Sequence, residues 1–259
     1  MGRLTLILLT TLLLAIAGCS GLDGSKKTVE TMKIVGSTSM LPLTEKLARQ
    51  YEKNHPNVRI YVQGGDSSLG LKGVAGGIAE IGSLSRPLTS AEKHKFNHYQ
   101  LTTDNIMVIV NPKFPVSHLT QDNIKDIFSG RVKNWKAFGG PDSSITVITR
   151  EQGSGTYNVF KDIIIGHTEI TENALVMAST GAVKAAVAMD KYAIGYISSQ
   201  YLTGEVQPVM IDDGKNESLV FSRPLIYITG SSPDDTSMGF IKFVLGAEGK
   251  AVINEHRIN

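Results

Sequence analysis

Arg150-Glu151-Gln152-Gly153-Ser154-Gly155-Thr156 joins two segments that predict different secondary structure. Residues 145–149 are rich in Ile, Thr and Val and predict a β-strand, whereas apolar residues recur at helical spacing over 157–165. The turn therefore places a guanidinium, two hydroxyls and glycines at the start of a helix. Free amides and the helix dipole favour an anion there, and glycine lets it approach the backbone. The stretch predicts an oxyanion site, and the alternative is an ordinary capped helix with a glycine turn.

The chain before this stretch alternates predicted strands and helices. The predicted strands are 32–35, 58–63 and 79–82, and the predicted helices begin near Pro42, Leu69 and Ser90. This βαβαβ order implies a largely parallel sheet with helices on its faces. In such sheets, ligands bind outside the carboxyl ends of the strands. The predicted fold class is therefore α/β.

Small hydroxyl residues follow the carboxyl end of each of these strands. The three turns contain Ser37-Thr38-Ser39, Ser67-Ser68, and Ser83 with Ser85-Arg86. A single serine-rich turn would be explained as a helix cap. Together with residues 150–156 there are four such turns, which share hydrogen-bond donors and contain few carboxylates. The shared pattern predicts an anion-binding site.

Five motifs follow one another in the order found in the phosphate-binding proteins of bacterial ABC transporters. They are residues 36–40, 64–68, 81–88, 127–135 and 150–156. From about Thr31 to the C-terminus, the chain resembles the shorter branch of that family. The resemblance implies a two-lobed periplasmic binding protein fold of type II, with phosphate bound in the cleft between the lobes. It also implies a protein without a catalytic step, cofactor or metal, which delivers phosphate to a permease.

The resemblance further implies which residues contact phosphate. They are Thr38, Ser39, Ser67, Arg150, Ser154, Gly155 and Thr156. The pattern of hydroxyl turns adds Ser37, Ser68, Ser85 and Arg86 as candidate contacts. Arg150 would make a charge-assisted contact with two parallel hydrogen bonds. Many longer members of the family have Asp where this chain has Ser85, and that carboxylate accepts the proton of monohydrogen phosphate. Asp66 and Glu151 are the candidate acceptors here, and another tetrahedral oxyanion such as sulfate remains an alternative ligand.

The N-terminus predicts export from the cytoplasm. The apolar run over residues 4–17 is too short to span a bilayer and suits a signal peptide. It ends in Ile16-Ala17-Gly18-Cys19, which resembles a bacterial lipoprotein signal with Cys19 as the lipidated residue. The alternative is a plain signal peptide. Cys19 is the only cysteine, so thiol chemistry and cysteine metal clusters are excluded from the mature chain. We expect a protein in the periplasm or at the cell surface, held to the membrane only by its lipid.

The chain length allows two modest lobes. Removal of residues 1–18 from the 259 leaves 241, which is more than one core usually organises. We expect residues 1–18 to be the signal peptide, 19–30 a flexible tether, 31–109 with 224–259 the first lobe, and 110–223 the second. A hinge is expected at Asn111-Pro112 and Pro115, with a return crossing over 219–228. One terminal helix is predicted over 238–255, with Phe240, Ile241, Val244 and Leu245 buried.

Composition and motifs weaken the competing functions. The chain has 26 Lys and Arg against 24 Asp and Glu, so it lacks the excess of basic residues that nucleic-acid binding requires. No G-x-S-x-G elbow occurs, and the six histidines are scattered without metal-ligand spacing. A hydrolase that used Ser154, and an interaction or sensor lipoprotein, remain as alternatives. We expect a monomeric binding protein that is not an enzyme, whose partners are inorganic phosphate and the permease subunits of an ABC transporter.

Two further residues each allow two interpretations. Trp135 is interpreted as core beneath the turn at Gly139-Gly140-Pro141, and a ligand platform is the alternative. Thr180 is interpreted as the cap of a helix that runs to Met189, and a further ligand contact is the alternative.

Overall fold

A computed structural model of the chain describes residues 29–214 and 217–258. The predicted signal peptide, the lipidated Cys19 and all of the tether before residue 29 lie outside these residues. Within the described ranges, no helix combines the length and the apolar composition needed to cross a bilayer.

The first half of the molecule begins with the predicted βαβαβ unit. It contains β1 (Glu30–Ser37), α2 (Leu41–Asn54), β2 (Val58–Gly65), α3 (Ser67–Ala75), β3 (Ile81–Leu84) and α4 (Ser90–Lys95). β1 pairs in parallel with β2 and with β3, as predicted. Leu43, Leu47 and Tyr51 are buried and form the apolar face of α2. The carboxyl ends of three parallel strands therefore meet at one edge.

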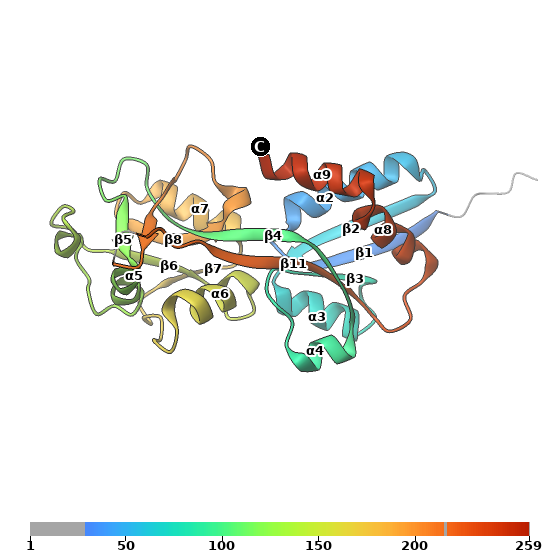
Figure 1. The fold of residues 1–259 in the computed structure, drawn as a ribbon, viewed down its shortest axis with the longest axis horizontal. Helices are drawn as coiled ribbons and strands as arrows, with labels where there is room; N and C mark the ends of the chain where they lie inside the picture. Colours follow the sequence, from blue (N-terminus) through green and yellow to red (C-terminus); the bar gives the residue numbers. More distant parts are fainter. Residues whose placement is uncertain (1–28, 215–216, 259) are drawn as a thin grey trace, which may run out of the picture.

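Two long strands connect this half to the second. β4 (Asn97–Val110) and β11 (Phe221–Thr229) lie side by side, antiparallel, and run through the middle of the molecule (Figure 1). β11 pairs with β3 on its other side, whereas residues 106–110 of β4 pair with β8. The passage between the halves therefore lies within these strands rather than at Asn111-Pro112. The Asn111 amide is instead buried in the second half, where it donates to the Ala188 carbonyl over 2.8 Å.

The second half has the same alternation of strands and helices. It contains β5 (His118–Thr120), α5 (Gln121–Phe128), η1 (Trp135–Phe138), β6 (Thr146–Arg150), α6 (Gly155–Val159), η2 (Phe160–Ile165), β7 (Leu175–Met177), α7 (Thr180–Met189), β8 (Ala193–Ser198), η3 (Ser199–Tyr201), β9 (Gln207–Pro208) and β10 (Met210–Asp212). Across the described residues, the main sheet has the order β2-β1-β3-β11-β4-β8-β6-β7, with β9 beside β4. β6 is parallel to both of its neighbours, so its carboxyl end bears the turn at residues 150–156.

Separate apolar clusters stabilise the two halves. One contains Met32, Leu43 and Phe240 with their neighbours, and another contains Phe128, Phe160 and further residues of the second half. Trp135 belongs to the latter cluster, and its indole nitrogen donates to the Tyr192 carbonyl over 2.8 Å. The interpretation of Trp135 as core is therefore confirmed.

The C-terminal prediction of one helix is wrong. The structure has α8 (Asp235–Leu245) and α9 (Ala247–Ile258), separated by Gly246 in an extended conformation with φ −76° and ψ 179°. Phe240, Ile241 and Val244 are buried as predicted, but Leu245 is 37% exposed because it lies at the break. Apolar periodicity alone did not reveal this break.

Candidate functional site

The hydroxyl turns of the first half meet at the carboxyl edge of the sheet. Ser37 Oγ lies 2.8 Å from Ser39 Oγ and 2.8 Å from Ser85 Oγ. The Ser85 amide donates to Ser67 Oγ over 3.2 Å. Because β1 and β3 are neighbours in the sheet, turns that are distant in the sequence converge here.

The first turn of α6 approaches this group from the second half. A β-carbon added at Gly155 would lie 2.4 Å from Ser67 Oγ and 2.7 Å from Ser85 Oγ, so only glycine permits the approach. Nearby, the amide and the hydroxyl of Ser68 both donate to the Gly153 carbonyl over 3.3 Å. The two halves are therefore in direct contact at this edge. We name as the hydroxyl cluster the buried side chains of Ser37, Thr38, Ser39, Ser67, Ser85 and Thr156.

Arg150 is the last residue of β6 and is 3% exposed. Its Nε and Nη2 donate to the two carboxylate oxygens of Glu151 over 2.8 and 2.6 Å. Nη1 donates to Thr180 Oγ1 over 3.1 Å, and Nε also donates to the Met177 carbonyl. The guanidinium is therefore held at a fixed place by its own half of the molecule.

Thr180 connects this arginine to the hydroxyl cluster. The Thr180 amide donates to Thr38 Oγ1 over 3.3 Å, while its hydroxyl accepts from Arg150. The interpretation of Thr180 as a cap is wrong, because Ser179 is the residue that caps α7. Tyr201 makes a second contact from η3, where its hydroxyl donates to the Thr38 carbonyl over 2.6 Å. Burial raises the pKa of Tyr201 to about 12, so this hydroxyl keeps its proton at neutral pH.

A second buried arginine, which sequence reasoning missed, also touches the cluster. Arg223 Nη1 donates to Thr156 Oγ1 over 2.7 Å, and to the Ser85 carbonyl and Ser85 Oγ over 3.2 and 3.3 Å. Its partner is Asp104, and both side chains are 0% exposed. Burial lowers the pKa of Arg223, and Asp104 opposes that shift. A charged residue within the otherwise apolar segment 219–228 is the sequence signal that would have identified it.

Some of the predicted site residues have other partners. The Arg86 guanidinium forms two hydrogen bonds with Glu92, over 2.8 and 2.7 Å, and lies at α4 rather than in the hydroxyl cluster. The Arg86 guanidinium holds the pKa of Glu92 below its ordinary value. Asp66 caps α3, where Oδ1 accepts the Leu69 amide over 2.6 Å.

Ser154 is buried, but the structure uses it as a cap. Its Oγ accepts the Tyr157 amide over 3.3 Å at the start of α6. In the part of the chain that the structure describes, no group of three or more His, Cys, Asp or Glu residues is placed to hold a metal ion. A serine nucleophile needs a hydrogen bond to a base, whereas the Ser154 hydroxyl accepts a backbone amide. The geometry of Ser154 therefore gives no support to the hydrolase alternative.

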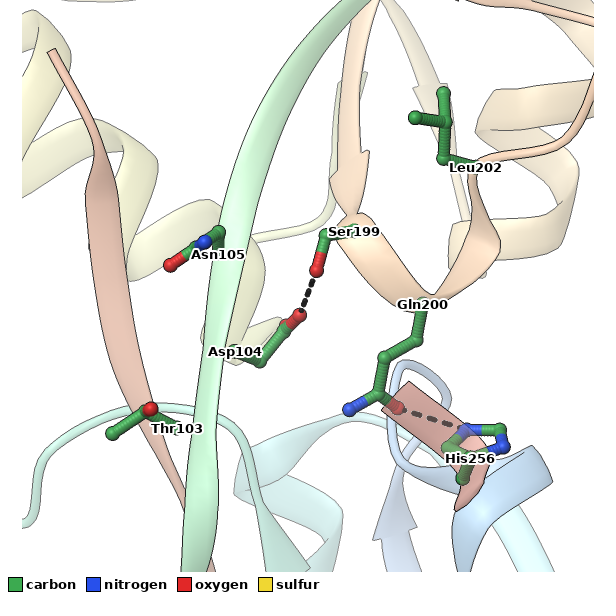
Figure 2. Close-up of a pocket in the computed structure, with 7 residues that line it drawn as sticks. All are labelled: Thr103, Asp104, Asn105, Ser199, Gln200, Leu202 and His256. Carbon is green, nitrogen blue, oxygen red and sulfur yellow. Dashed lines mark hydrogen bonds between the residues drawn. The ribbon is translucent and has the colours of Figure 1, made fainter. Parts of the chain in front are cut away.

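A cavity of about 220 Å³ borders the opposite side of the Asp104 carboxylate. Figure 2 shows the hydrogen bond from Ser199 Oγ to Asp104 Oδ1, 2.9 Å long, together with the contact between His256 and Gln200. The latter contact joins α9 of the first half to η3 of the second. Asp104 thus has one oxygen directed to Arg223 and the other to Ser199.

The chain matches a known domain family and is similar in sequence to phosphate-binding proteins. The domain family described as the PBP superfamily domain matches residues 23–248. The phosphate-binding protein PstS of Borreliella burgdorferi is 26% identical, and the match covers 92% of this chain and 91% of that protein.

Solved structures agree with this match. One is assigned as a phosphate ABC transporter substrate-binding protein from Clostridium perfringens, with bound phosphate. It aligns with a TM-score of 0.81 and 32% identity over 88% of this chain and 98% of that one. An ABC-type phosphate transport receptor from Vibrio cholerae aligns with a TM-score of 0.69 and 30% identity over 87% and 98% of the two chains. The predicted fold class is confirmed by these likenesses.

Proposed function

The chain belongs to the PBP superfamily, and we propose that it captures inorganic phosphate outside the cytoplasm and delivers it to an ABC transporter. The observation that carries the proposal is the buried hydroxyl cluster, which collects side chains from both halves beside Arg150 and Arg223. Its relatives are named for phosphate binding and transport, which supports a role as a binding protein rather than an enzyme.

The chemistry of the cluster suits a tetrahedral oxyanion. Removing a charged anion from water is costly unless hydrogen-bond donors replace the lost water. Hydroxyl groups can donate or accept, so the serines and threonines can turn their hydrogens toward an oxyanion. The proposed contacts are Thr38, Ser39, Ser67, Ser85, Arg150, Gly155 and Thr156. Ser37 Oγ contacts Ser39 Oγ and Ser85 Oγ. We leave Arg86 out because its guanidinium is paired with Glu92 at α4, and Ser68 because its hydroxyl donates to the Gly153 carbonyl.

Glu151 is the stronger of the two candidates for the proton acceptor. It is bonded to Arg150, which we propose as a ligand, whereas Asp66 is used as the cap of α3. A carboxylate beside the arginine would accept the proton of monohydrogen phosphate and repel sulfate, which has none to give. The proposal therefore assigns phosphate selectivity to Glu151.

Binding requires that the two halves separate and close again. The members of the hydroxyl cluster are at most 7% exposed, so an anion cannot reach them while Gly155 lies against Ser67 and Ser85. We propose that the lobes are residues 31–109 with 224–259, and 110–223, and that β4 and β11 bend between them. Small-angle X-ray scattering should show a smaller radius of gyration when phosphate is added. An unchanged radius at saturating phosphate would contradict the closure.

We also propose that Cys19 anchors the protein by a lipid to a bacterial membrane after residues 1–18 are removed, and that the protein is a monomer. The support for the lipid anchor is the sequence Ile16-Ala17-Gly18-Cys19. In cells labelled with a fatty acid, the wild-type protein should carry the label and remain with membranes. Cys19→Ala should lose both properties. A labelled or membrane-held Cys19→Ala protein would contradict the anchor.

Calorimetric titration of the mature protein tests the proposed function. We expect phosphate to bind tightly, arsenate to compete because of its similar shape and protonation, and sulfate and molybdate to bind at least about a hundredfold more weakly, or about 2.7 kcal/mol. Sulfate binding as tight as phosphate binding would favour the alternative oxyanion. No heat with any of the four anions would overturn the function.

A further inference from the structure

Arg223 combines complete burial with an ion pair. Its Nε and Nη2 both donate to Asp104 Oδ2, over 2.9 and 2.7 Å. A buried pair contributes little net stability compared with apolar residues of the same size, because both charges lose their water. The pair fixes the direction of the guanidinium, since Asp104 is itself held by Ser199. A cation held in a fixed direction at this depth points to a role beyond packing.

The remaining nitrogen of Arg223 contacts both halves. Nη1 carries two hydrogens, and its acceptors are Thr156 Oγ1 of α6 and the two oxygens of Ser85, which follows β3. Ser85 and Thr156 belong to opposite sides of the interface that Gly155 closes. Because Arg223 lies on β11, one of the two connecting strands, its three contacts exist together only when the halves are closed.

These contacts also set the direction of the hydroxyl groups. A guanidinium can only donate, so Thr156 Oγ1 and Ser85 Oγ must both act as acceptors toward Arg223. The hydroxyl hydrogen of Thr156 is then left to point at another acceptor, such as an anion oxygen, and that of Ser85 can point at an anion oxygen or at Ser37 Oγ, 2.8 Å away. A hydroxyl that would otherwise donate or accept equally well is thereby converted into a donor.

We propose that Arg223 is a positioning residue for the anion. It orients Thr156 and Ser85 as donors in the closed form and adds a second positive charge beside the site, while Asp104 holds it in place. This inference rests on the proposed function, because it assumes that phosphate binds in the hydroxyl cluster. The relevant ligand class is a small tetrahedral oxyanion.

A double-mutant cycle tests this inference by phosphate calorimetry. Arg223→Lys keeps the positive charge but loses the planar guanidinium with its several fixed donors. Thr156→Val loses the hydroxyl at similar volume, and the third variant combines the two substitutions. We expect each single variant to bind phosphate at least about tenfold more weakly. The phosphate affinity of the double variant should be at most about threefold lower than that of the single variant that binds phosphate less tightly, since both substitutions remove the same oriented donor. Multiplied losses would overturn the inference, because a merely structural role for Arg223 acts independently of the Thr156 hydroxyl.

Arg86→Lys is the matched control, since it also alters an arginine that is paired with a carboxylate but lies outside the cluster. It should change phosphate affinity less than about twofold, and a tenfold loss would contradict the inference. If Arg223→Lys does not fold, Asp104→Asn replaces it and should show the same coupling to Thr156→Val. A wild-type protein that does not bind phosphate would instead contradict the proposed function. If the wild type binds phosphate and the Arg223 variants bind it equally tightly, only the positioning role of Arg223 is contradicted.

Discussion

Arg150 is the residue on which the proposed site depends most. Its guanidinium is buried, is bonded to Glu151 and Thr180, and reaches Thr38 of the other half through Thr180. We expect Arg150→Ala to weaken phosphate binding by at least about 2 kcal/mol, because a hydrogen bond to a charged partner costs about this much to lose. Calorimetry measures the phosphate affinity of this variant and of Arg86→Ala, which serves as the control because Arg86 lies outside the hydroxyl cluster. Equal affinities of Arg150→Ala and wild type would remove Arg150 from the site.

Glu151 and Asp66 differ in the role that their surroundings allow. Both oxygens of Glu151 accept from Arg150, whereas Asp66 accepts a helix amide, a role that Asn fulfils equally well. Glu151→Gln should therefore narrow the affinity gap between phosphate and sulfate by about tenfold or more, or about 1.4 kcal/mol, and Asp66→Asn should leave it unchanged. Competition between the two anions measures this gap. The opposite result would assign the acceptor to Asp66.

The residue types of the site were predictable, but their partners were not. Serine, threonine and glycine after successive strands indicated Ser37, Ser39, Ser85 and the turn at 150–156, because parallel strands bring their carboxyl ends together. The hydrogen bonds of Arg86 with Glu92 depend on side-chain directions in three dimensions, and spacing in the sequence does not give these.

At the scale of elements, the contact of α6 with the first half depends on the absence of a side chain at Gly155. A methyl group there would overlap Ser67 Oγ and Ser85 Oγ and hold the halves apart. We expect Gly155→Ala to weaken phosphate binding at least about tenfold, or about 1.4 kcal/mol, with less effect on the unfolding temperature of the ligand-free protein. Gly204→Ala is the control, since nothing lies near a β-carbon at that position. Normal phosphate affinity in Gly155→Ala would show that this contact is dispensable.

Local sequence rules identified most of the elements, and their failures have physical causes. Thr120 caps α5, and Asn123 completes a reciprocal pair of cap hydrogen bonds. The terminal helix was predicted as one because apolar spacing continues past Gly246, whose extended backbone breaks it. Arg223 was not among the predicted site residues because segment 219–228 was interpreted only as the return crossing between the lobes.

At the scale of the whole molecule, His256 of α9 contacts Gln200 of η3 across the two halves. Burial, and secondly the charge of Lys46, lower the pKa of His256 from its ordinary value of 6.5. The folded form therefore binds this proton less readily than the unfolded chain. The stability that depends on neutral His256 is present above about pH 6.5 and is lost as the pH falls through the lower folded-state value.

Replacement of His256 by Gln should therefore reduce the loss of stability on acidification. Urea unfolding at several pH values between 7 and 5 measures the free energy of unfolding of wild type and His256→Gln. We expect the wild-type value to fall more than that of the variant over this range. If the free energies of unfolding of wild type and variant fall equally with pH, His256 does not contribute to the loss of stability on acidification.

The order of the strands follows from the sequence pattern, while the relation between the halves does not. The βαβαβ unit predicted the parallel sheet, but the passage of β4 and β11 between the halves depends on pairings between distant segments. Only the closed arrangement brings Arg223 to Thr156 and Gly155 to Ser67. The site is therefore a property of the assembled molecule rather than of any one motif.

A crystal structure of the mature protein grown with phosphate tests the central claim most directly. We expect one phosphate between the halves, with its oxygens within hydrogen-bond distance of Arg150 and of the Thr38, Ser39 and Thr156 donors. Phosphate bound away from these residues, or none bound between the halves at saturating phosphate, would contradict the proposed site.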